Sequence, residues 1–385
     1  MTQWPWMAVC LLAVSLPVPA AEAQPASDLA AMLRTPGALQ SRLRFDHLTT
    51  AEGLSNDSVF SILQDRHGFL WFGTQGGLNR YDGYTLTQYL QDPRNPNSIA
   101  GDFVQFLFED SKGNIWCGRN ALSRFDPSTE TFTRYNLPEG AVQRGVIWAM
   151  REDRLGRLWM AMSGDLKVYR LDPKTGQYTA FKTLPDAPPG MLGTIESLHA
   201  DTAGILWVGT SHGLVRFDPA TGSSKNYPQD HPNPKIPVTR IRGIAQDGSS
   251  KLWLATNEGA VNFFDPVAGA LSRRWAAPDP AALGIDRNNT IASGPDGILW
   301  LGTLNGLQAF DPATGAAGVV QHRPADRFSL SANEIWATTI DRDGDLWVGT
   351  KGGGVNRLSP SAMKFGAWRP CQPQQSERRQ RALDL

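Results

Sequence analysis

Short apolar runs alternate with turns rich in glycine and aspartate along most of the chain. In one complete unit these runs occupy residues 59–64, 69–73, 78–81 and 85–89. The first run is apolar and is predicted to be the innermost strand of a sheet, whereas the last alternates between apolar and polar positions and is predicted to face solvent. The pattern therefore predicts four short strands per unit, joined by tight turns.

The unit repeats, and each copy places a tryptophan in its second strand. The tryptophans recur at intervals of 43 to 48 residues and stand at Trp71, Trp116, Trp159, Trp207, Trp253, Trp300 and Trp347. A fixed period in this range, with four strands per unit, is typical of β-propeller blades. The sequence predicts an all-β fold, a seven-bladed β-propeller of four-stranded antiparallel blades, with each indole ring buried between adjacent blades.

The ring is predicted to close through the N-terminal strand. Residues 44–48 precede the first inner strand by the interval that separates outer from inner strands elsewhere, since Phe45 to Val59 spans 14 residues. Pairing this strand into the seventh blade would lock the first blade to the last and remove free edges. Residues 363–368 also have the pattern of an outer strand, so two segments compete for one position.

The remaining segments are assigned from composition. An apolar run over residues 7–16, followed by Ala21 and Ala23 in an A-x-A pattern, predicts a signal peptide over residues 1–23, with a buried N-terminal helix as the alternative. Residues 24–41 are predicted to be a disordered linker, 42–368 the propeller, and 369–385 a disordered tail. No later stretch is long and apolar enough for a transmembrane helix, so a periplasmic or secreted protein is expected.

Composition narrows the classes of partner. The 385 residues contain 37 Lys and Arg against 37 Asp and Glu. This balance argues against a nucleic-acid partner or an anionic membrane surface. Three cysteines allow neither a disulfide framework nor a cysteine-based zinc site.

A ligand site is predicted on the face that carries the long blade-to-blade loops, because binding surfaces concentrate on loops held by a rigid scaffold. The turns between second and third strands share this face and offer polar side chains at Gln75, Asn120, His212, Asn257, Glu258, Asn305 and Lys351. Three more polar residues begin inner strands from the same side, namely Asp57, Asp102 and Asn333. Together they predict a polar cup for a glycan or another small hydrophilic ligand. The alternative is that they are solvated turn residues selected for backbone geometry.

The sequence contains few residues in arrangements typical of a catalytic or metal site. The six histidines have no metal-binding spacing, and the chain has neither a G-x-S-x-G motif nor a phosphate-binding glycine loop. Residues 341–345 have the spacing of a calcium loop, but the other units share this turn without its carboxylates, which favours a hairpin. No catalytic residue, metal or cofactor is therefore predicted, and His212 is the histidine that merits a test.

The repeated phrase D-x-x-G-x-[LI]-W-x-G-T, followed by G-L-x-R-[FY]-D-P, resembles the two-component regulator propeller family. Residues 53–57, 97–102 and 329–333 resemble the family's phrase before the inner strand, and the likeness extends over residues 45–360. It implies a periplasmic sensor region of a histidine kinase or diguanylate cyclase that reports ligand occupancy to a membrane partner. The family's second propeller, immunoglobulin-like domain, membrane helix and output domain have no counterpart here. The chain is therefore expected to be a non-enzymatic sensor module, either truncated or working with a separate membrane sensor kinase.

Two alternatives remain open. Residues 294–300 resemble a phrase of seven-bladed lyases of the streptogramin-lyase type, which would imply a Mg²⁺-dependent enzyme with a His/Glu pair, here His212 and Glu258. The other alternative is a protein-interaction platform whose face docks a partner or a second copy of the chain.

Overall fold

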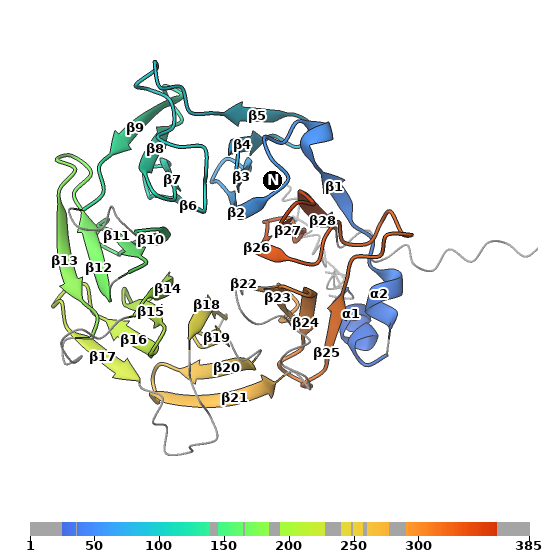
Figure 1. Cartoon of the computed structure of the whole chain (residues 1–385). Helices are drawn as coiled ribbons and strands as arrows, with labels where there is room; N and C mark the ends of the chain where they lie inside the picture. Colours follow the sequence, from blue (N-terminus) through green and yellow to red (C-terminus); the bar gives the residue numbers. More distant parts are fainter. Residues whose placement is uncertain are drawn as a thin grey trace, which may run out of the picture.

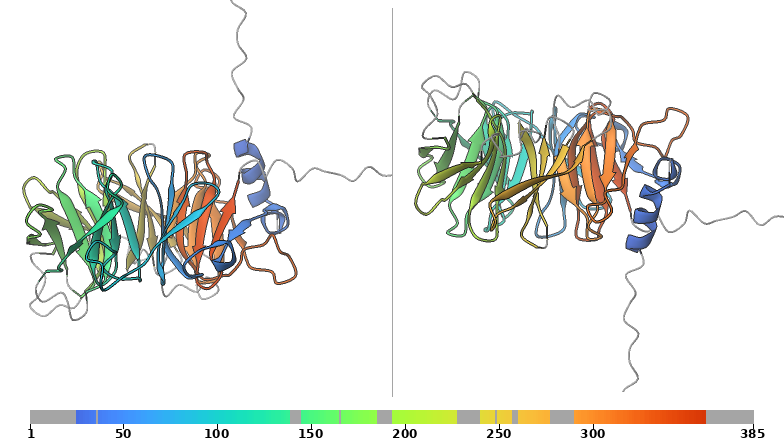
Figure 2. Two further views of the ribbon diagram at one scale, coloured as in Figure 1. Left: turned by 90° about the horizontal axis from the view of Figure 1, so that it is seen from above. Right: turned by 90° about the horizontal axis from the view of Figure 1, so that it is seen from below.

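The computed structural model describes residues 25–35, 37–138, 145–164, 166–184, 193–227, 240–247, 249–256, 260–276 and 290–359. Their strands form seven four-stranded antiparallel sheets arranged around a central axis (Figure 1). Seen from the side, the sheets make a flat disc (Figure 2). The predicted seven-bladed β-propeller is confirmed.

The blades are numbered in chain order. Blade 1 contains β2 (Val59–Gln64), β3 (Leu70–Thr74), β4 (Gly77–Tyr81) and β5 (Leu86–Tyr89). Blade 2 contains β6 (Phe106–Glu109), β7 (Ile115–Gly118), β8 (Leu122–Asp126) and β9 (Thr131–Tyr135). Blade 3 contains β10 (Ile147–Glu152), β11 (Leu158–Met162), β12 (Lys167–Leu171) and β13 (Tyr178–Lys182). Blade 4 contains β14 (Ile195–Ala200), β15 (Leu206–Thr210), β16 (Gly213–Phe217) and β17 (Ser224–Tyr227).

Blade 5 contains β18 (Ile241–Gln246), β19 (Leu252–Thr256), β20 (Ala260–Asp265) and β21 (Ala270–Ala276). Blade 6 contains β22 (Thr290–Ser293), β23 (Leu299–Thr303), β24 (Gly306–Phe310) and β25 (Ala317–Val320). Blade 7 contains β26 (Ile335–Ile340), β27 (Leu346–Thr350), β28 (Val355–Leu358) and, as its outer strand, β1 (Asp46–Leu48).

The repeated tryptophans lie between blades, as predicted. Each second strand is buried, and its indole packs against the third strand of the following blade. The Trp159 ring, for example, lies 5.1 Å from the Phe217 ring of blade 4, and the Trp207 ring lies 5.1 Å from the Phe264 ring of blade 5. A side chain of this size removes on the order of 200 Å² from water, so the seven indoles stabilise the contacts that hold the blades together.

The glycine two residues after the tryptophan allows neighbouring blades to approach closely. A Cβ atom on Gly209 would lie 2.6 Å from the carbonyl oxygen of Ile241 in the next blade. At the equivalent Gly73, a Cβ atom would lie 2.8 Å from the carbonyl oxygen of Val104. At these positions the glycine allows close contact between the second strand of one blade and the chain that enters the next blade. Blades 3 and 5 carry Ala161 and Ala255 at the equivalent position.

The tryptophan nitrogen is held by an aspartate from the preceding hairpin. Trp116 Nε1 donates to Asp110 Oδ2 at 2.8 Å, and the other carboxylate oxygen of Asp110 accepts backbone N–H groups within the turn. The same bond recurs from Trp71 to Asp65, Trp159 to Asp153, Trp207 to Asp201, Trp253 to Asp247 and Trp347 to Asp341. We call this arrangement the Asp–Trp clamp. In blade 7 it identifies residues 341–345 as a hairpin turn, as predicted.

The ring closes through β1. This strand pairs antiparallel with β28, with Asp46 opposite Arg357 and Leu48 opposite Val355. A backbone bond from Gly354 N to Asp57 O, 2.8 Å long, joins blade 7 to the start of blade 1. The predicted closure by the N-terminal strand is confirmed. The competing segment, residues 363–368, lies outside the described residues.

Two helices stand where the sequence was expected to be a disordered linker. Helices α1 (Pro25–Leu33) and α2 (Ala38–Arg42) pack on the outer strand of blade 6, and a 3₁₀ turn, η1 (Thr50–Glu52), follows β1 (Figure 1). Leu29 and Leu33 are buried, as is Leu39, whose side chain covers Gly318. The apolar residues of α1 recur at helical spacing and find a partner surface on β25, which a judgement from composition alone overlooked.

The predicted signal peptide and C-terminal tail lie outside the described residues. Within the described part of the chain, no helix has the length and apolar character needed to cross a membrane.

Candidate functional site

A β-bulge recurs at the start of the inner strands. In blade 1 the pairing shifts by one residue between Val59 and Ser61, so Phe60 has no partner on β3. Equivalent register shifts place Trp148, Glu196, Arg242 and Trp336 on bulges of their inner strands. A bulge leaves its extra residue outside the ladder and can redirect the side chain. In blade 2, Gln105 occupies the corresponding place directly after Val104, and its N–H donates to Gly118 O at 2.8 Å.

Burial changes abruptly at these positions. The preceding residue is β-branched and fully buried in six blades, at Val59, Val104, Ile147, Ile195, Ile241 and Ile335. The bulge residues and Gln105 are all partly exposed instead. The β-branched residue thus anchors the inner strand in the core, and the residue after it presents its side chain to the axis.

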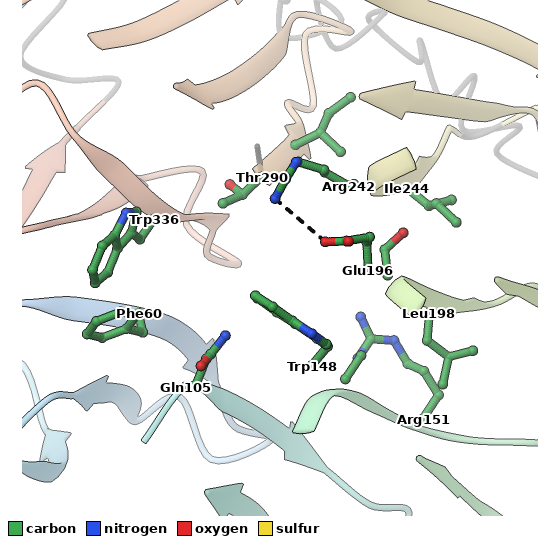
Figure 3. Close-up of a pocket in the computed structure, with 14 residues that line it drawn as sticks. Phe60, Gln105, Trp148, Arg151, Glu196, Leu198, Arg242, Ile244, Thr290 and Trp336 are labelled. Carbon is green, nitrogen blue, oxygen red and sulfur yellow. Dashed lines mark ion pairs between the residues drawn. The ribbon is translucent and has the colours of Figure 1, made fainter. Parts of the chain in front are cut away.

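These side chains line a cavity on the axis. It has a volume of about 230 Å³ and receives residues from all seven blades, with Thr290 and Ile291 representing blade 6 (Figure 3). We call it the axial cavity. The bulges lie at the loop end of the inner strands, beside the turns between second and third strands, as the bond from Gln75 N to Ser58 O shows. The axial cavity therefore belongs to the face on which the sequence predicted a site.

One wall of the axial cavity carries an ion pair. Arg242 Nη1 lies 3.6 Å from Glu196 Oε2, and both side chains are only 7% exposed. Arg240 approaches the other carboxylate oxygen of Glu196 at 3.5 Å. The carboxylate of Glu196 is therefore neutralised by two guanidinium groups.

A further guanidinium, that of Arg151 in blade 3, also lines the cavity. Its Nη1 donates to the carbonyl oxygen of Met150 at 2.7 Å. Burial lowers the pKa of Arg151. In blade 4, burial and then the positive charge of Arg151 lower the pKa of His199, whose Nε2 lies 3.4 Å from Gln246 Oε1. Both effects favour the neutral form of the His199 imidazole.

A row of aromatic rings extends from the axial cavity across blades 7, 1 and 2. Phe60 lies between Trp336 and Phe103, with ring centroids 3.8 Å and 4.5 Å away. The guanidinium of Arg119 lies 4.3 Å above the Phe103 ring, and Lys351 Nζ lies 5.3 Å from the Trp336 ring. This aromatic row offers flat apolar surfaces whose two ends carry positive charge.

A second cavity adjoins the blade 2 end of the aromatic row. It has a volume of about 270 Å³ and is lined by residues 100–103 of the connecting loop and 119–121 of the turn between β7 and β8. Phe103 and Arg119 belong both to this cavity and to the aromatic row. Two residues predicted from the sequence, Asp102 and Asn120, lie here together.

The three predicted residues that begin inner strands each hold a loop. Asp57 accepts the Thr50 N–H at 2.7 Å, Asp102 that of Gln91 at 2.6 Å, and Asn333 that of His322 at 2.7 Å. Their side chains anchor the connection that leads into each blade. Their role in ligand binding stays a prediction.

The predicted turn residues differ in their surroundings. Gln75 and Asn120 are exposed, whereas Asn305 accepts two bonds of 3.0 Å from Gln321 Nε2. His212 Nδ1 lies 3.0 Å from Ser211 Oγ, and Lys351 pairs with Glu334 at 3.3 Å. Asn257 and Glu258 lie outside the described residues. Of the predicted set, Lys351 reaches the aromatic row, and Asp102 and Asn120 share the second cavity.

Sequence analysis missed the bulge residues themselves. The signal was present at one repeat position, directly after the buried β-branched residue. There the sequence varies among Phe60, Gln105, Trp148, Glu196, Arg242 and Trp336, while the flanking residues repeat. Because the side chain at this equivalent position differs in most blades, the fold does not require any one residue type there.

Comparison with known proteins gives one family and several similar folds. Residues 53–76 and 329–352 match the model of the family described as two component regulator propeller. A curated relative, histidine kinase P4 of Formosa agariphila, is 43% identical over 63 residues, which make up 16% of this chain and 5% of the relative.

Two solved structures illustrate the shared fold. The extracellular domain of a protein described as a putative hybrid two component system from B. thetaiotaomicron has a TM-score of 0.66 and 24% identity, over 83% of this chain and 42% of that chain. Virginiamycin B lyase from Staphylococcus aureus has a TM-score of 0.64 and 15% identity, over 82% of this chain and 99% of that chain. At these identities the likeness shows the fold alone.

The chain spans less than half of the sensor structure and a twentieth of the curated kinase. The two matched segments fall in blades 1 and 7, where the inner and second strands carry the repeated phrase. The chain carries two-component regulator propeller repeats, and the family resemblance indicated by its sequence is confirmed.

Proposed function

We propose that this propeller is the ligand-recognition part of an extracytoplasmic sensor, and that it binds a small hydrophilic ligand, a glycan, at the axial cavity. One observation carries the proposal. Bulges in blades 1, 3, 4, 5 and 7 aim chemically varied side chains into one shared cavity, on the face with the long loops. Bulges are frequent next to functional sites because they redirect side chains.

The lining suits a saccharide. Sugar rings have apolar C–H faces and polar hydroxyl edges, and the cavity offers aromatic surfaces at Phe60, Trp148 and Trp336. The Gln105 amide and the charged groups of Glu196 and Arg242 can hydrogen-bond hydroxyl groups. Because 230 Å³ is below the usual size of a pocket that encloses a drug-sized ligand, the axial cavity would take one or two sugar units of a longer chain.

Signalling requires an output that the described residues do not contain. By analogy with the extracellular domain of the hybrid two component system, the propeller would lie outside the cytoplasmic membrane, in the periplasm or at the cell surface. It would report occupancy to a membrane sensor kinase, either a continuation of the chain or a separate partner. A ligand that touches several blades at once gives the propeller a bound state that such a partner can distinguish.

The proposal is tested by calorimetric titration with a panel of neutral and acidic oligosaccharides, each with and without Mg²⁺. Binding that does not require Mg²⁺, and that Trp148→Ala abolishes while Trp275→Ala leaves it intact, is the expected result. Each variant removes one tryptophan. Trp148 lines the axial cavity, whereas Trp275 belongs to β21, the outer strand of blade 5, and serves as the control. Saccharide binding that survives Trp148→Ala would contradict the axial site.

A Mg²⁺-dependent lyase is the second candidate, because the fold of virginiamycin B lyase matches this chain over 99% of the lyase's own length. Within the described ranges, no three His, Cys, Asp or Glu side chains are grouped so as to hold a metal. The experiment is an assay of streptogramin B linearisation with Mg²⁺. We expect no turnover, whereas turnover lost on His212→Ala would establish the lyase.

The interaction platform can be distinguished by the same titrations. If the long-loop face docks a second copy, light scattering will show a dimer that Lys351→Glu or Arg119→Glu dissociates. We expect a monomer whose mass does not change when the saccharide binds.

A further inference from the structure

The walls of the axial cavity carry more positive than negative charge. Two guanidinium groups, those of Arg151 and Arg242, line it, against a single carboxylate among the described lining residues, that of Glu196. Glu196 already pairs with Arg242 and with Arg240. The charge of Arg151 is therefore in excess.

Arg151 stands where the fold needs no charge. The position is the inner-strand residue opposite the repeated tryptophan, here Trp159. The same position holds neutral side chains in the other blades, namely Leu63, Phe108, His199, Ala245, Ala292 and Thr339. An apolar residue at this position is compatible with a folded blade, so the guanidinium is available for another task.

No carboxylate among the described residues forms an ion pair with Arg151, and its bond to Met150 O satisfies one of its five N–H donors. The neighbouring Trp148 Nε1 is buried and has no acceptor within the described part of the structure. Figure 3 shows the nitrogen-bearing edge of this indole turned toward Arg151. The Trp148 N–H is costly to bury unless a ligand supplies an acceptor. The Arg151 guanidinium lines the same cavity and has further N–H groups to offer that ligand.

We propose that the axial cavity binds a uronate, a sugar unit that bears a carboxylate, which pairs with Arg151 while the sugar ring contacts Trp148. This inference rests on the proposed glycan-binding function and names the class of its ligand. A planar carboxylate matches the two parallel N–H donors of a guanidinium better than a hydroxyl group does.

The substitution Arg151→Leu tests the inference, because blade 1 already carries Leu63 at this position and the variant is expected to fold. Calorimetry would compare oligogalacturonate, oligoguluronate and oligoglucuronate with the same oligosaccharides after reduction of their carboxyl groups. We expect at least one uronate to bind, reduction to weaken its binding about 10- to 100-fold, and Arg151→Leu to weaken it by a similar factor. Arg154→Leu, which removes an exposed charge from the hairpin at the opposite face of blade 3, should leave binding unchanged.

The outcomes separate this inference from the proposed function. If reduced and native oligosaccharides bind equally well and Arg151→Leu has no effect, the uronate assignment is wrong while the glycan site stands. If Arg151→Leu weakens reduced and native forms equally, Arg151 acts on the cavity's shape and the assignment is again wrong. If no oligosaccharide binds in either form, both the inference and the proposed function fail.

Discussion

Blade 3 contains two tryptophans that differ in almost every physical respect. Trp159 belongs to the repeat, is fully buried between blades 3 and 4, and donates to Asp153 at 2.8 Å. Trp148 stands on a bulge, is partly exposed in the axial cavity, and its buried N–H has no acceptor among the described residues. Within one blade, the repeated residue serves the fold and the residue that varies among blades is free to serve a ligand.

The largest effect is expected from the comparison of these two tryptophans. Trp159→Ala removes a fully buried ring and its clamp, and should lower the free energy of unfolding by about 3–5 kcal/mol. Trp148→Ala removes a ring that faces the cavity and should change it by less than about 1 kcal/mol. Urea unfolding followed by circular dichroism measures both. Equal losses would remove the distinction between structural and functional tryptophans.

The next effect concerns the hairpin aspartates. Asp110→Ala leaves the Trp116 indole N–H and two turn N–H groups without an acceptor, so it should cost about 2–3 kcal/mol of stability. The matched control is Asp343→Ala, in the turn of blade 7, whose exposed side chain is outside the clamp. The difference in thermal midpoint between the variants checks the prediction. A loss no larger for Asp110→Ala than for the control would show that the clamp contributes nothing.

A smaller effect on stability is expected at Asp57, and it distinguishes a residue that anchors a loop from one that binds a ligand. Asp57→Ala removes the acceptor of the Thr50 N–H and should cost about 1 kcal/mol. It should leave saccharide affinity unchanged, because Asp57 is not among the lining residues of either cavity described here. Asn120→Ala, in the exposed turn of blade 2, should leave stability unchanged. A loss of affinity without a loss of stability at Asp57 would restore it as a binding residue.

The smallest effect is the response of the Asp153 clamp in blade 3 to acid. Burial of Asp153 favours its protonated form, but hydrogen bonds from Trp159 and from Arg157 outweigh burial and lower its pKa. A carboxyl whose pKa is lower in the folded state stabilises the fold above its unfolded pKa, near 4, and this stability is lost as the pH falls through the folded value. Urea midpoints between pH 6 and pH 2.5 should therefore fall more steeply for the wild type than for Asp153→Asn. Parallel slopes would exclude a contribution from Asp153.

The sequence predicted the parts of the fold that repeat. Seven tryptophans at intervals of 43 to 48 residues identified the blades, and the interval from Phe45 to Val59 identified the closing strand. Helices α1 and α2 were missed because they lie outside the repeat and their segment was assigned from composition, whereas the helical spacing of the apolar residues in α1 was the signal that could have identified them.

The candidate site was predicted only in part. Loop length and strand polarity placed it on the face to which the axial cavity belongs, since turns of a blade alternate between the two faces of the disc. The axial residues were not predicted, because a β-bulge depends on the pairing of two strands and shifts one residue out of the alternating pattern. Without the bulge, Trp148 and Glu196 have the pattern of ordinary core positions.

The axial site itself is tested most directly by hydrogen–deuterium exchange, with and without whichever saccharide of the panel binds. The account predicts that the ligand protects the backbone amides of the inner strands around Trp148, Glu196 and Trp336, while the hairpin turns at Asp110 and Asp153 stay unchanged. Protection confined to the outer strands or to the hairpin turns, with no change in the inner strands, would contradict it.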